Sequence, residues 1–482
     1  MDYSTALELV KALARDVKAG HLWALRDAAV HRRRRQDLWM ALNALLVWHR
    51  PKLEAEAGLD YPYKMLREKG AILASLASDS QDPFVRHQAE LYLGLLPFPG
   101  QWRRLSALET SANKDAEVVD FVRQEEAKIA EKIFEKSEKT FHIRHFMQVL
   151  KSPQNPHEKG VLRLFALPYL LARTPLLEPL TRRFVLFVEP PMGIVWRHSW
   201  WRRFCSGENP CLFGLGGSED RQFIGTQHHA LALPLAHGDF LEDLNKPPCA
   251  KEPKAFDLVF NATFDDMARK RHLFMLDLLT HQELSGKTAL FLGRGRPENV
   301  QAFRRAVTQR GLASRVTVRP NVPRREVPHL LSQCRLGVHL SLYENACRAI
   351  MEFFRSNVPC VVSTCMAGIN LEMFTHETGA AVPDGRLVQT IAEVLENAHQ
   401  YAPRRWFLRE SGSLVSTRRL NEALKTLFLE WGLVWTKDIV TLTSSGASRY
   451  GSRDDEKRFH EEHLWIAQRL QHALPFGFQV LP

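Results

Sequence analysis

The chain has 482 residues, which suggests two or three domains, and its 45% hydrophobic and 25% charged residues are ordinary for a globular protein. Its net charge of +11 suits a partner that carries phosphate, although a solvated basic surface explains so modest an excess as well. Seven cysteines without a CxxC pair argue against a disulfide framework and a zinc site, and no apolar run approaches the roughly 20 residues that span a bilayer.

The N-terminal stretch MDYSTALELVKALARD contains early acidic residues and lacks the apolar centre of a signal peptide. The odd number of cysteines is typical of a reducing compartment. We therefore expect a cytoplasmic protein. Any contact with a membrane would be peripheral, at its inner face.

Residues 1–155 are expected to form an all-α helical domain. Apolar residues recur there at spacings of three and four, as in Ala6, Leu9, Val10 and Leu13. Two of the expected helices lie at residues 83–96 and 116–136. This segment by itself indicates no chemistry.

Residues 156–250 are expected to form a small α/β domain. A linker rich in proline, asparagine and charge precedes it, and short apolar runs then alternate with helical stretches. The candidate strands lie at residues 161–168, 184–188, 211–215 and 230–235.

One segment of this domain, GIVWRHSWWRRF at residues 193–204, combines three tryptophans with basic side chains. Gly193 allows a backbone to approach a ligand closely, and His198 is a candidate base on the acceptor side, although a lone histidine is more often structural. Tryptophan beside arginine suits a sugar face or a membrane interface. Tryptophans that pack the domain while the arginines reach water are an equally good interpretation.

Residues 251–435 are expected to form a second α/β domain, in which strands and helices alternate as in a parallel sheet with right-handed crossovers. The candidate strands lie at residues 257–262, 288–292, 316–318, 336–340, 359–362 and 380–382. The candidate helices lie at residues 267–282, 297–310, 325–333, 345–356 and 386–399. Residues 436–482 add a polar loop and a helix at 454–473.

The stretch LGVHLSLYENACRAIME, residues 336–352, reads as a buried strand, a turn and a helix that starts at Asn345. Glu344 follows the strand, and Glu352 lies in the helix. Ligands bind at the carboxyl ends of parallel strands, and a helix start offers N–H groups to an anion. Taken singly, Glu344 could be a helix cap and Glu352 a helix-surface residue.

The region 235–400 resembles the nucleotide-sugar-binding domain of GT-B glycosyltransferases, specifically the retaining group of family 4. The family's motifs occur in its order: AHGDF as the interdomain loop, FNATFDDMARKRH as the donor-diphosphate loop, and FLGRG as a strand ending in G-x-G. SLYENACRAIME then falls on the E-x7-E motif, and PCVVSTCMAG on the strand and glycine after it. The resemblance implies a GT-B fold of two Rossmann-like domains, here with an additional helical domain.

By this resemblance, Glu344 contacts the donor sugar and Glu352 binds the ribose hydroxyls. Lys270 and the backbone of Asn345 and Ala346 face the diphosphate. Gly293 and Arg271 complete the donor site. The family often needs no metal or other cofactor, because protein cations neutralise the diphosphate.

The sequence departs from the family pattern at several positions. Thr263 stands where an arginine is usual, and Asn345 and Cys347 replace the glycines after the first glutamate. Arg269 or Arg271 is a possible substitute for the missing cation. Cys347, with no histidine partner in sequence reach, is interpreted as a small buried residue rather than a nucleophile.

The resemblance implies a hexosyltransferase that moves a sugar from a nucleoside-diphosphate sugar to a glycan, a glycolipid or another hydroxyl acceptor, as in polysaccharide biosynthesis. One alternative is a non-catalytic scaffold of the same fold that binds a protein through its helical domain. Another is a nucleotide-sugar epimerase, which would call for further catalytic acids and histidines. Dispersed basic residues and the lack of a recognition motif argue against nucleic acid as a partner.

Overall fold

The computed structural model describes residues 1–18, 61–95, 140–143, 146–154, 158–165, 176–190, 210–225, 229–244, 254–341, 344–345, 347–364, 368–444, 450–473 and 477–480, with Phe204, Met366 and scattered residues of 34–56. The chain forms two compact units. Unit 1 comprises Met1–Ile129 and Asp266–Phe274, and unit 2 comprises Ala130–Asp265 and Met275–Pro482.

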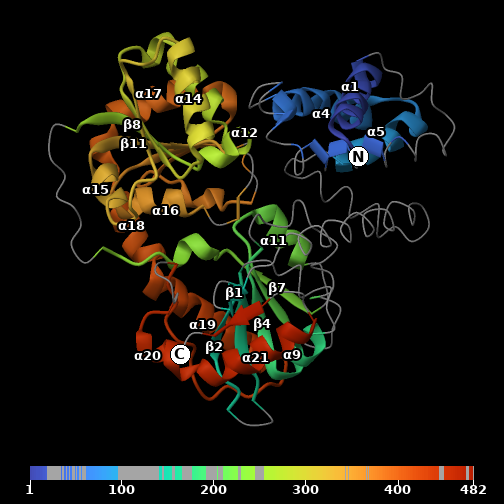
Figure 1. Ribbon diagram of the computed structural model, residues 1–482, viewed down its shortest axis with the longest axis vertical. Helices are drawn as coiled ribbons and strands as arrows, with labels where there is room; N and C mark the ends of the chain where they lie inside the picture. The colour runs from blue at the N-terminus through green and yellow to red at the C-terminus, as the bar shows by residue number, and fades with distance from the viewer. Residues whose placement is uncertain are drawn as a thin grey trace. The chain divides into compact units, whose positions relative to one another are not determined.

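The regular elements described in unit 1 are all helices. The helices α1 (Tyr3–Lys18), α4 (Tyr61–Asp79) and α5 (Pro83–Leu95) pack together in the blue part of Figure 1. Their buried apolar residues recur at helical spacing, as Ala6 and Val10 do in α1. The predicted helix at 83–96 is confirmed by α5, whereas the one at 116–136 lies outside the described residues.

The first sheet of unit 2 has five strands in the order β2-β3-β4-β6-β7. Its strands are β2 (Met147–Lys151), β3 (Gly160–Leu164), β4 (Phe184–Val188), β6 (Cys211–Gly214) and β7 (Ala230–Leu233). All neighbours are parallel except β2, which runs antiparallel to β3. The four predicted strands of this region are therefore confirmed, with small shifts at their ends.

Helices from two distant parts of the chain accompany this sheet. They are α9 (Leu177–Arg183), α11 (Ser218–Gly225), α19 (Ser413–Glu430), α20 (Arg453–Arg458) and α21 (His460–Ala473). In Figure 1 the red C-terminal helices lie against the green strands. Leu420, Leu424, Leu427 and Phe428 of α19 share one buried cluster with residues of β3, β4 and β6.

Residues 140–151 differ from the expectation of an almost entirely helical segment up to residue 155. Thr140–His142 forms β1, which pairs in parallel with β14 (Gly477–Gln479), and β2 follows at once. All five residues of β2 are buried, including Gln148 and Lys151. The strand β2 forms because it pairs with β3 and its two polar residues are buried. Neither contact is visible as a local pattern in the sequence.

The second sheet of unit 2 has six parallel strands in the order β10-β9-β8-β11-β12-β13. They are β8 (Phe256–Asn261), β9 (Ala289–Gly293), β10 (Val316–Pro320), β11 (Cys334–His339), β12 (Cys360–Ser363) and β13 (Gly379–Val382). This order is that of a Rossmann sheet, with its switch point between β8 and β11. The expected fold class of two Rossmann-like bodies with additional helices is confirmed.

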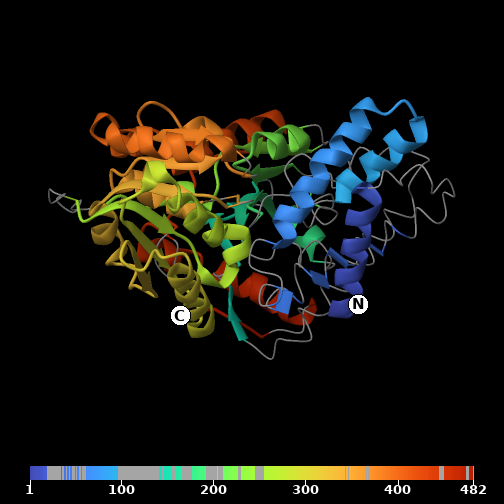
Figure 2. The same cartoon turned by 90° about the horizontal axis from the view of Figure 1, so that it is seen from above.

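The helices α13 (His272–Leu279), α14 (Pro297–Gln309), α15 (Val327–Ser332), α16 (Arg348–Arg355), α17 (Leu387–Glu396) and α18 (Pro403–Glu410) accompany this sheet. Figure 2 shows the orange and the yellow helices on opposite sides of the strands. The predicted helix at 267–282 is divided into α12 (Met267–Lys270) and α13, because Arg271 adopts a left-handed φ of 60°. Among the described residues, no helix is long and apolar enough to cross a membrane.

Candidate functional site

The two glutamates lie near the switch point of the second sheet. Glu344 follows β11, and Glu352 lies in α16, which packs against β11 and β12. Both are largely buried, with exposed fractions of 8% and 9%. Glu352 is therefore not the solvated helix-surface residue of the alternative interpretation.

Polar side chains from two elements hold the Glu352 carboxylate. Asn261, the last residue of β8, donates its Nδ2 to Glu352 Oε2 at 3.0 Å. Arg348 donates its Nε to Glu352 Oε1 at 2.8 Å and its NH1 to the Ser444 carbonyl at 3.2 Å. The charge-assisted bond and the Asn261 contact fix the carboxylate where β8 ends.

Helix α16 starts at Arg348, three residues later than the sequence predicts. Asn345 forms a bend before the helix, and its main chain is not a helix start. Its side chain instead donates Nδ2 to the carbonyls of Pro190 and Gly214, at 2.7 and 3.0 Å, and accepts from the Gly216 main-chain nitrogen at 3.1 Å. A glycine, which is usual in the family at this position, has no side chain to make these bonds.

Three glycines allow backbones to meet closely around Glu344 and Asn345. A Cβ on Gly368, which has a φ of +78°, would lie 1.7 Å from the Glu344 carbonyl oxygen. A Cβ on Gly216 would lie 2.8 Å from the Asn345 carbonyl oxygen, and one on Gly217 would lie 2.9 Å from the Gly368 Cα. The loops after β6, β11 and β12 therefore pack at a separation that only glycine permits.

The other residues predicted for the donor site contact different parts of the chain. Gly293 ends β9, where a Cβ would lie 1.9 Å from the Ala262 carbonyl oxygen. Thr263, in the place of the expected arginine, donates its Oγ1 to the Arg294 carbonyl at 3.0 Å. Lys270 and Arg271 are buried and belong to unit 1, whereas the two glutamates belong to unit 2.

Within the segment of unit 1 that carries Lys270, Arg269 pairs with Asp266 at 2.6 Å. The Arg271 guanidinium lies 3.8 Å from the ring centre of Phe274. Ala346 of the donor site and Gly193 and His198 of the acceptor side lie outside the described residues.

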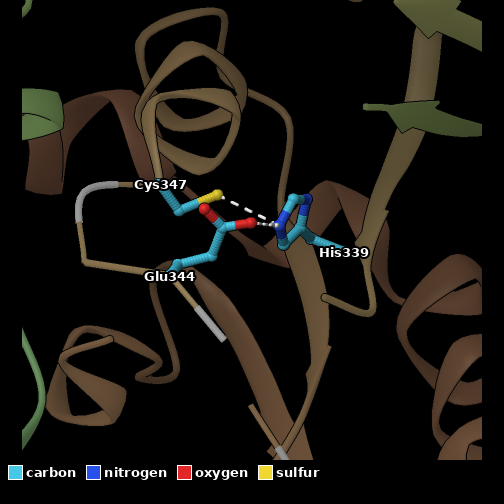
Figure 3. Close-up of side chains that lie close together, drawn as sticks. All are labelled: His339, Glu344 and Cys347. Atoms are coloured by element: carbon cyan, nitrogen blue, oxygen red, sulfur yellow. Dashed lines mark hydrogen bonds and ion pairs between the residues drawn. The ribbon is translucent and has the colours of Figure 1, made fainter. Parts of the chain in front are cut away.

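A histidine partner of Cys347 is present, which corrects the expectation that none is in reach. Figure 3 shows His339, Glu344 and Cys347 with their functional groups converging. The Nε2 atom of His339 lies 3.2 Å from Cys347 Sγ and 3.5 Å from Glu344 Oε1. His339 is the last residue of β11 and Cys347 precedes α16, so the end of the strand and the start of the helix bring the two together. The sequence signal that could have revealed this contact is the histidine at the carboxyl end of a buried strand.

The first sheet contributes a buried polar cluster that sequence reasoning missed. Arg163 of β3 donates its Nε to Glu189 Oε2 at 2.8 Å and its NH1 to Gln148 Oε1 at 3.1 Å. Its guanidinium also lies 3.4 Å from His237 Nδ1 and over the ring of Phe240. This cluster joins the carboxyl ends of β3 and β4 to the AHGDF segment.

The AHGDF segment forms η4 (His237–Phe240). Its Asp239 Oδ2 accepts from the Ala236 main-chain nitrogen at 2.8 Å. Burial, with a smaller contribution from the nearby Glu189 carboxylate, raises the pKa of Asp239 to about 6 against the lowering effect of the Ala236 hydrogen bond. A Cβ on Gly238 would lie 3.2 Å from the Arg348 main-chain nitrogen, so this segment packs directly on the start of α16.

Residues 269–406 match the family model of glycosyl transferases group 1, so this part of the chain is a group 1 glycosyltransferase domain. The match includes both glutamates, Asn345, Gly293 and His339. No curated protein matches the chain.

Solved structures with similarity to the chain include sucrose-phosphate synthase from Thermosynechococcus elongatus, with 16% identity and a TM-score of 0.41 over 52% of this chain and 69% of that one. The pneumococcal O-GlcNAc transferase GtfA, in complex with UDP and GlcNAc, has 15% identity and a TM-score of 0.39 over 52% and 53%. Anabaena HepE, in complex with UDP and glucose, has 16% identity and a TM-score of 0.41 over 51% and 72%. TM-scores of this size do not establish a shared activity.

Proposed function

We propose that this glycosyltransferase moves a hexose, with retention of configuration, from a nucleoside-diphosphate sugar to a hydroxyl group of a glycan or glycolipid. The observation that carries the proposal is the pair Glu344 and Glu352. Both lie in the matched domain and both are largely buried. Both also lie on the chain that leaves β11 at the switch point between β8 and β11, where ligands of such sheets bind.

The chemistry of the two carboxylates suits a sugar nucleotide. An ionised carboxylate accepts hydrogen bonds from two adjacent hydroxyl groups. We assign the donor sugar to Glu344 and the ribose hydroxyls to Glu352. Arg348 and Asn261 hold Glu352 in one orientation, which reduces the entropy lost when a ribose binds.

The leaving diphosphate gains negative charge in the transition state, so cations and N–H groups aimed at it lower the barrier. Lys270 is our candidate for the cation, with Arg271 next to it, and the main chain of Asn345 and Ala346 supplies the candidate N–H groups. Because protein groups take this role, the proposed transfer needs neither a metal nor another cofactor.

The acceptor side is proposed from charge and composition. The net charge of +11 suits an acceptor or a surface that carries phosphate, such as a lipid-linked glycan at the inner face of a membrane. Gly193 and His198 remain our candidates there. The buried Arg163 cluster lies at the carboxyl ends of β3 and β4, in the same sheet.

A nucleotide screen tests this function. The full chain would be heated with UDP, GDP, ADP and CMP, and with their sugars, and the melting temperature recorded. A ligand at 100 times its Kd stabilises by about 2.7 kcal/mol, which is a readily measured shift. The proposal expects one nucleotide to raise the melting temperature, and Glu352→Gln to reduce that rise while Glu396→Gln, an exposed glutamate of α17, keeps it.

Two observations favour the second candidate function, a non-catalytic scaffold. The Asn345 side chain is fully engaged with loops of the first sheet, and Thr263 offers no charge to a diphosphate. A scaffold would show no melting shift with any nucleotide or nucleotide sugar. That outcome would overturn the transferase proposal.

A further inference from the structure

Three side chains of different chemistry bring their potential ligand atoms close together at the end of β11. His339 Nε2 lies 3.2 Å from Cys347 Sγ and 3.5 Å from Glu344 Oε1, and all three ligand atoms lie within 4.8 Å of one another. In Figure 3 both dashed lines end on the same ring nitrogen. All three residues are buried, and His339 is only 1% exposed.

A single ring nitrogen, His339 Nε2, faces both the Cys347 thiol and the Glu344 carboxylate. If Nε2 accepts from the Cys347 thiol, its lone pair also faces the Glu344 carboxylate. If Nε2 carries a proton and donates to Glu344, the separation of 3.5 Å is long for an N–H···O bond. A cation among the three atoms interacts favourably with all of them at once.

The separations match a tetrahedral metal site. Zinc binds histidine nitrogen at about 2.0 Å, carboxylate oxygen at about 2.0 Å and cysteine sulfur at about 2.3 Å. Tetrahedral angles then place N and S about 3.5 Å apart, and N and O about 3.3 Å apart. The measured separations of 3.2 and 3.5 Å lie within a few tenths of an ångström of these values.

We propose that His339, Glu344 and Cys347 form a three-ligand site for a thiophilic divalent cation, with zinc the best match. Thiolate with imidazole selects zinc over magnesium or calcium, which prefer oxygen ligands. The ligands come from the end of a strand, the connection after it and the residue before a helix, so main-chain elements position them. The spacing His-x4-Glu-x2-Cys is not one that a search for paired cysteines detects.

The site has a consequence for transfer, and this part rests on the proposed function. Glu344 is the proposed contact of the donor sugar, and a metal-bound carboxylate has fewer lone pairs to offer. Metal and donor sugar would therefore compete for Glu344. We expect zinc to inhibit transfer, and high concentrations of nucleotide sugar to relieve the inhibition.

Metal binding is tested without any measurement of transfer. The full chain, stripped with a chelator, would be titrated with Co²⁺, whose bond to a thiolate gives an intense ultraviolet charge-transfer absorption. The proposal expects one equivalent of Co²⁺ to give this absorption, Zn²⁺ to abolish it, and Zn²⁺ to raise the melting temperature. Cys347→Ser and His339→Gln should each reduce the affinity at least tenfold.

The matched control is Cys334→Ser. Cys334 is also a buried cysteine, at the start of the same strand, where its Sγ donates to the Leu330 carbonyl, and it lies outside the cluster. This variant should keep the full absorption. Circular dichroism and melting of each metal-free variant show whether it folds. If Cys347→Ser does not fold, the Co²⁺ titration of His339→Gln tests the metal site in its place.

Two outcomes would overturn the proposal. One is a wild-type chain that shows neither the thiolate absorption with Co²⁺ nor a higher melting temperature with Zn²⁺. The other is an absorption that persists unchanged in Cys347→Ser. Glu352→Gln separates this proposal from the proposed function, because Glu352 is not a ligand: it should keep the Co²⁺ absorption whether or not transfer exists.

Discussion

The side chain of Asn345 accepts a hydrogen bond from the main-chain nitrogen of Gly216 at 3.1 Å, which fastens the loop after β11 to the loop after β6. The two loops belong to different sheets. Asn345, one of the two residues that stand in place of the expected glycines, thus connects the first sheet to the segment that carries Glu344.

Removing this connection should destabilise the protein. Asn345→Ala deletes three hydrogen bonds and leaves two buried carbonyls and one buried N–H without that partner. Each unsatisfied buried group costs about 1–3 kcal/mol, so we expect a loss of at least about 2 kcal/mol in the free energy of unfolding. Urea denaturation measures it. Asn397→Ala, at an exposed position at the end of α17, is the control, and equal losses in the two variants would contradict the assigned role.

Replacing Gly368 should displace the Glu344 main chain. Gly368→Ala places a Cβ 1.7 Å from the Glu344 carbonyl oxygen, in addition to the strain of a φ of +78°. Gly286→Ala is a matched control, because Gly286 has a φ of +76° and open space around its Cβ position. We expect about 1–2 kcal/mol of destabilisation for Gly286→Ala from the left-handed backbone. Gly368→Ala should destabilise the protein clearly more than this and lower the melting shift caused by the donor nucleotide. Similar losses of stability for the two variants would show that the backbone at Gly368 and Glu344 moves apart to accept the Cβ.

Glu344 and Glu352 should each be needed for transfer. Glu344→Ala and Glu352→Ala remove the proposed contacts of the sugar and the ribose, and the loss of such a contact typically lowers the rate about 100-fold or more. The measurement is kcat/KM with the nucleotide sugar that the thermal screen identifies. Turnover that stays unchanged in both variants would reject the site, provided that circular dichroism shows both to be folded.

The buried ion pair of the first sheet should be far more sensitive than an exposed one. Glu189→Gln leaves the fully buried Arg163 guanidinium without its countercharge, and we expect a loss of about 3–5 kcal/mol. The control is Glu178→Gln, which breaks an exposed pair with Arg182 in α9 and should cost under about 1 kcal/mol. Urea denaturation compares them. A small loss for Glu189→Gln would indicate that water enters the cluster.

The raised pKa of Asp239 predicts that the stability of the protein depends on pH. Its folded-state pKa of about 6 lies above the ordinary value of 3.8, so between these values the folded protein holds a proton that the unfolded chain has released. Stability therefore falls as the pH rises from about 4 to about 6. Asp239→Asn keeps the shape without the charge, so its melting temperature relative to the wild type should rise over this range and then level off. A difference that stays constant between pH 4 and pH 7 would contradict the raised pKa.

The sequence determined the second sheet almost completely. Its six predicted strands are present, and α14 begins at the predicted Pro297 and ends one residue early. Continuous apolar runs separated by amphipathic helices carry this information locally, because both faces of a parallel strand are buried. For the same reason the sequence placed Glu344 after a strand and Glu352 in the helix that follows.

Only the tertiary structure decided which side chains meet. β2 forms because β3 is beside it, and the buried Arg163 finds its countercharge in Glu189, the residue that follows the neighbouring strand β4. The bonds of Asn345 cross 129 or more positions of the chain. The meeting of His339 with Cys347 depends on where β11 ends and where α16 begins. Local patterns fix elements, whereas contacts between elements depend on packing and register, which no short stretch of sequence contains.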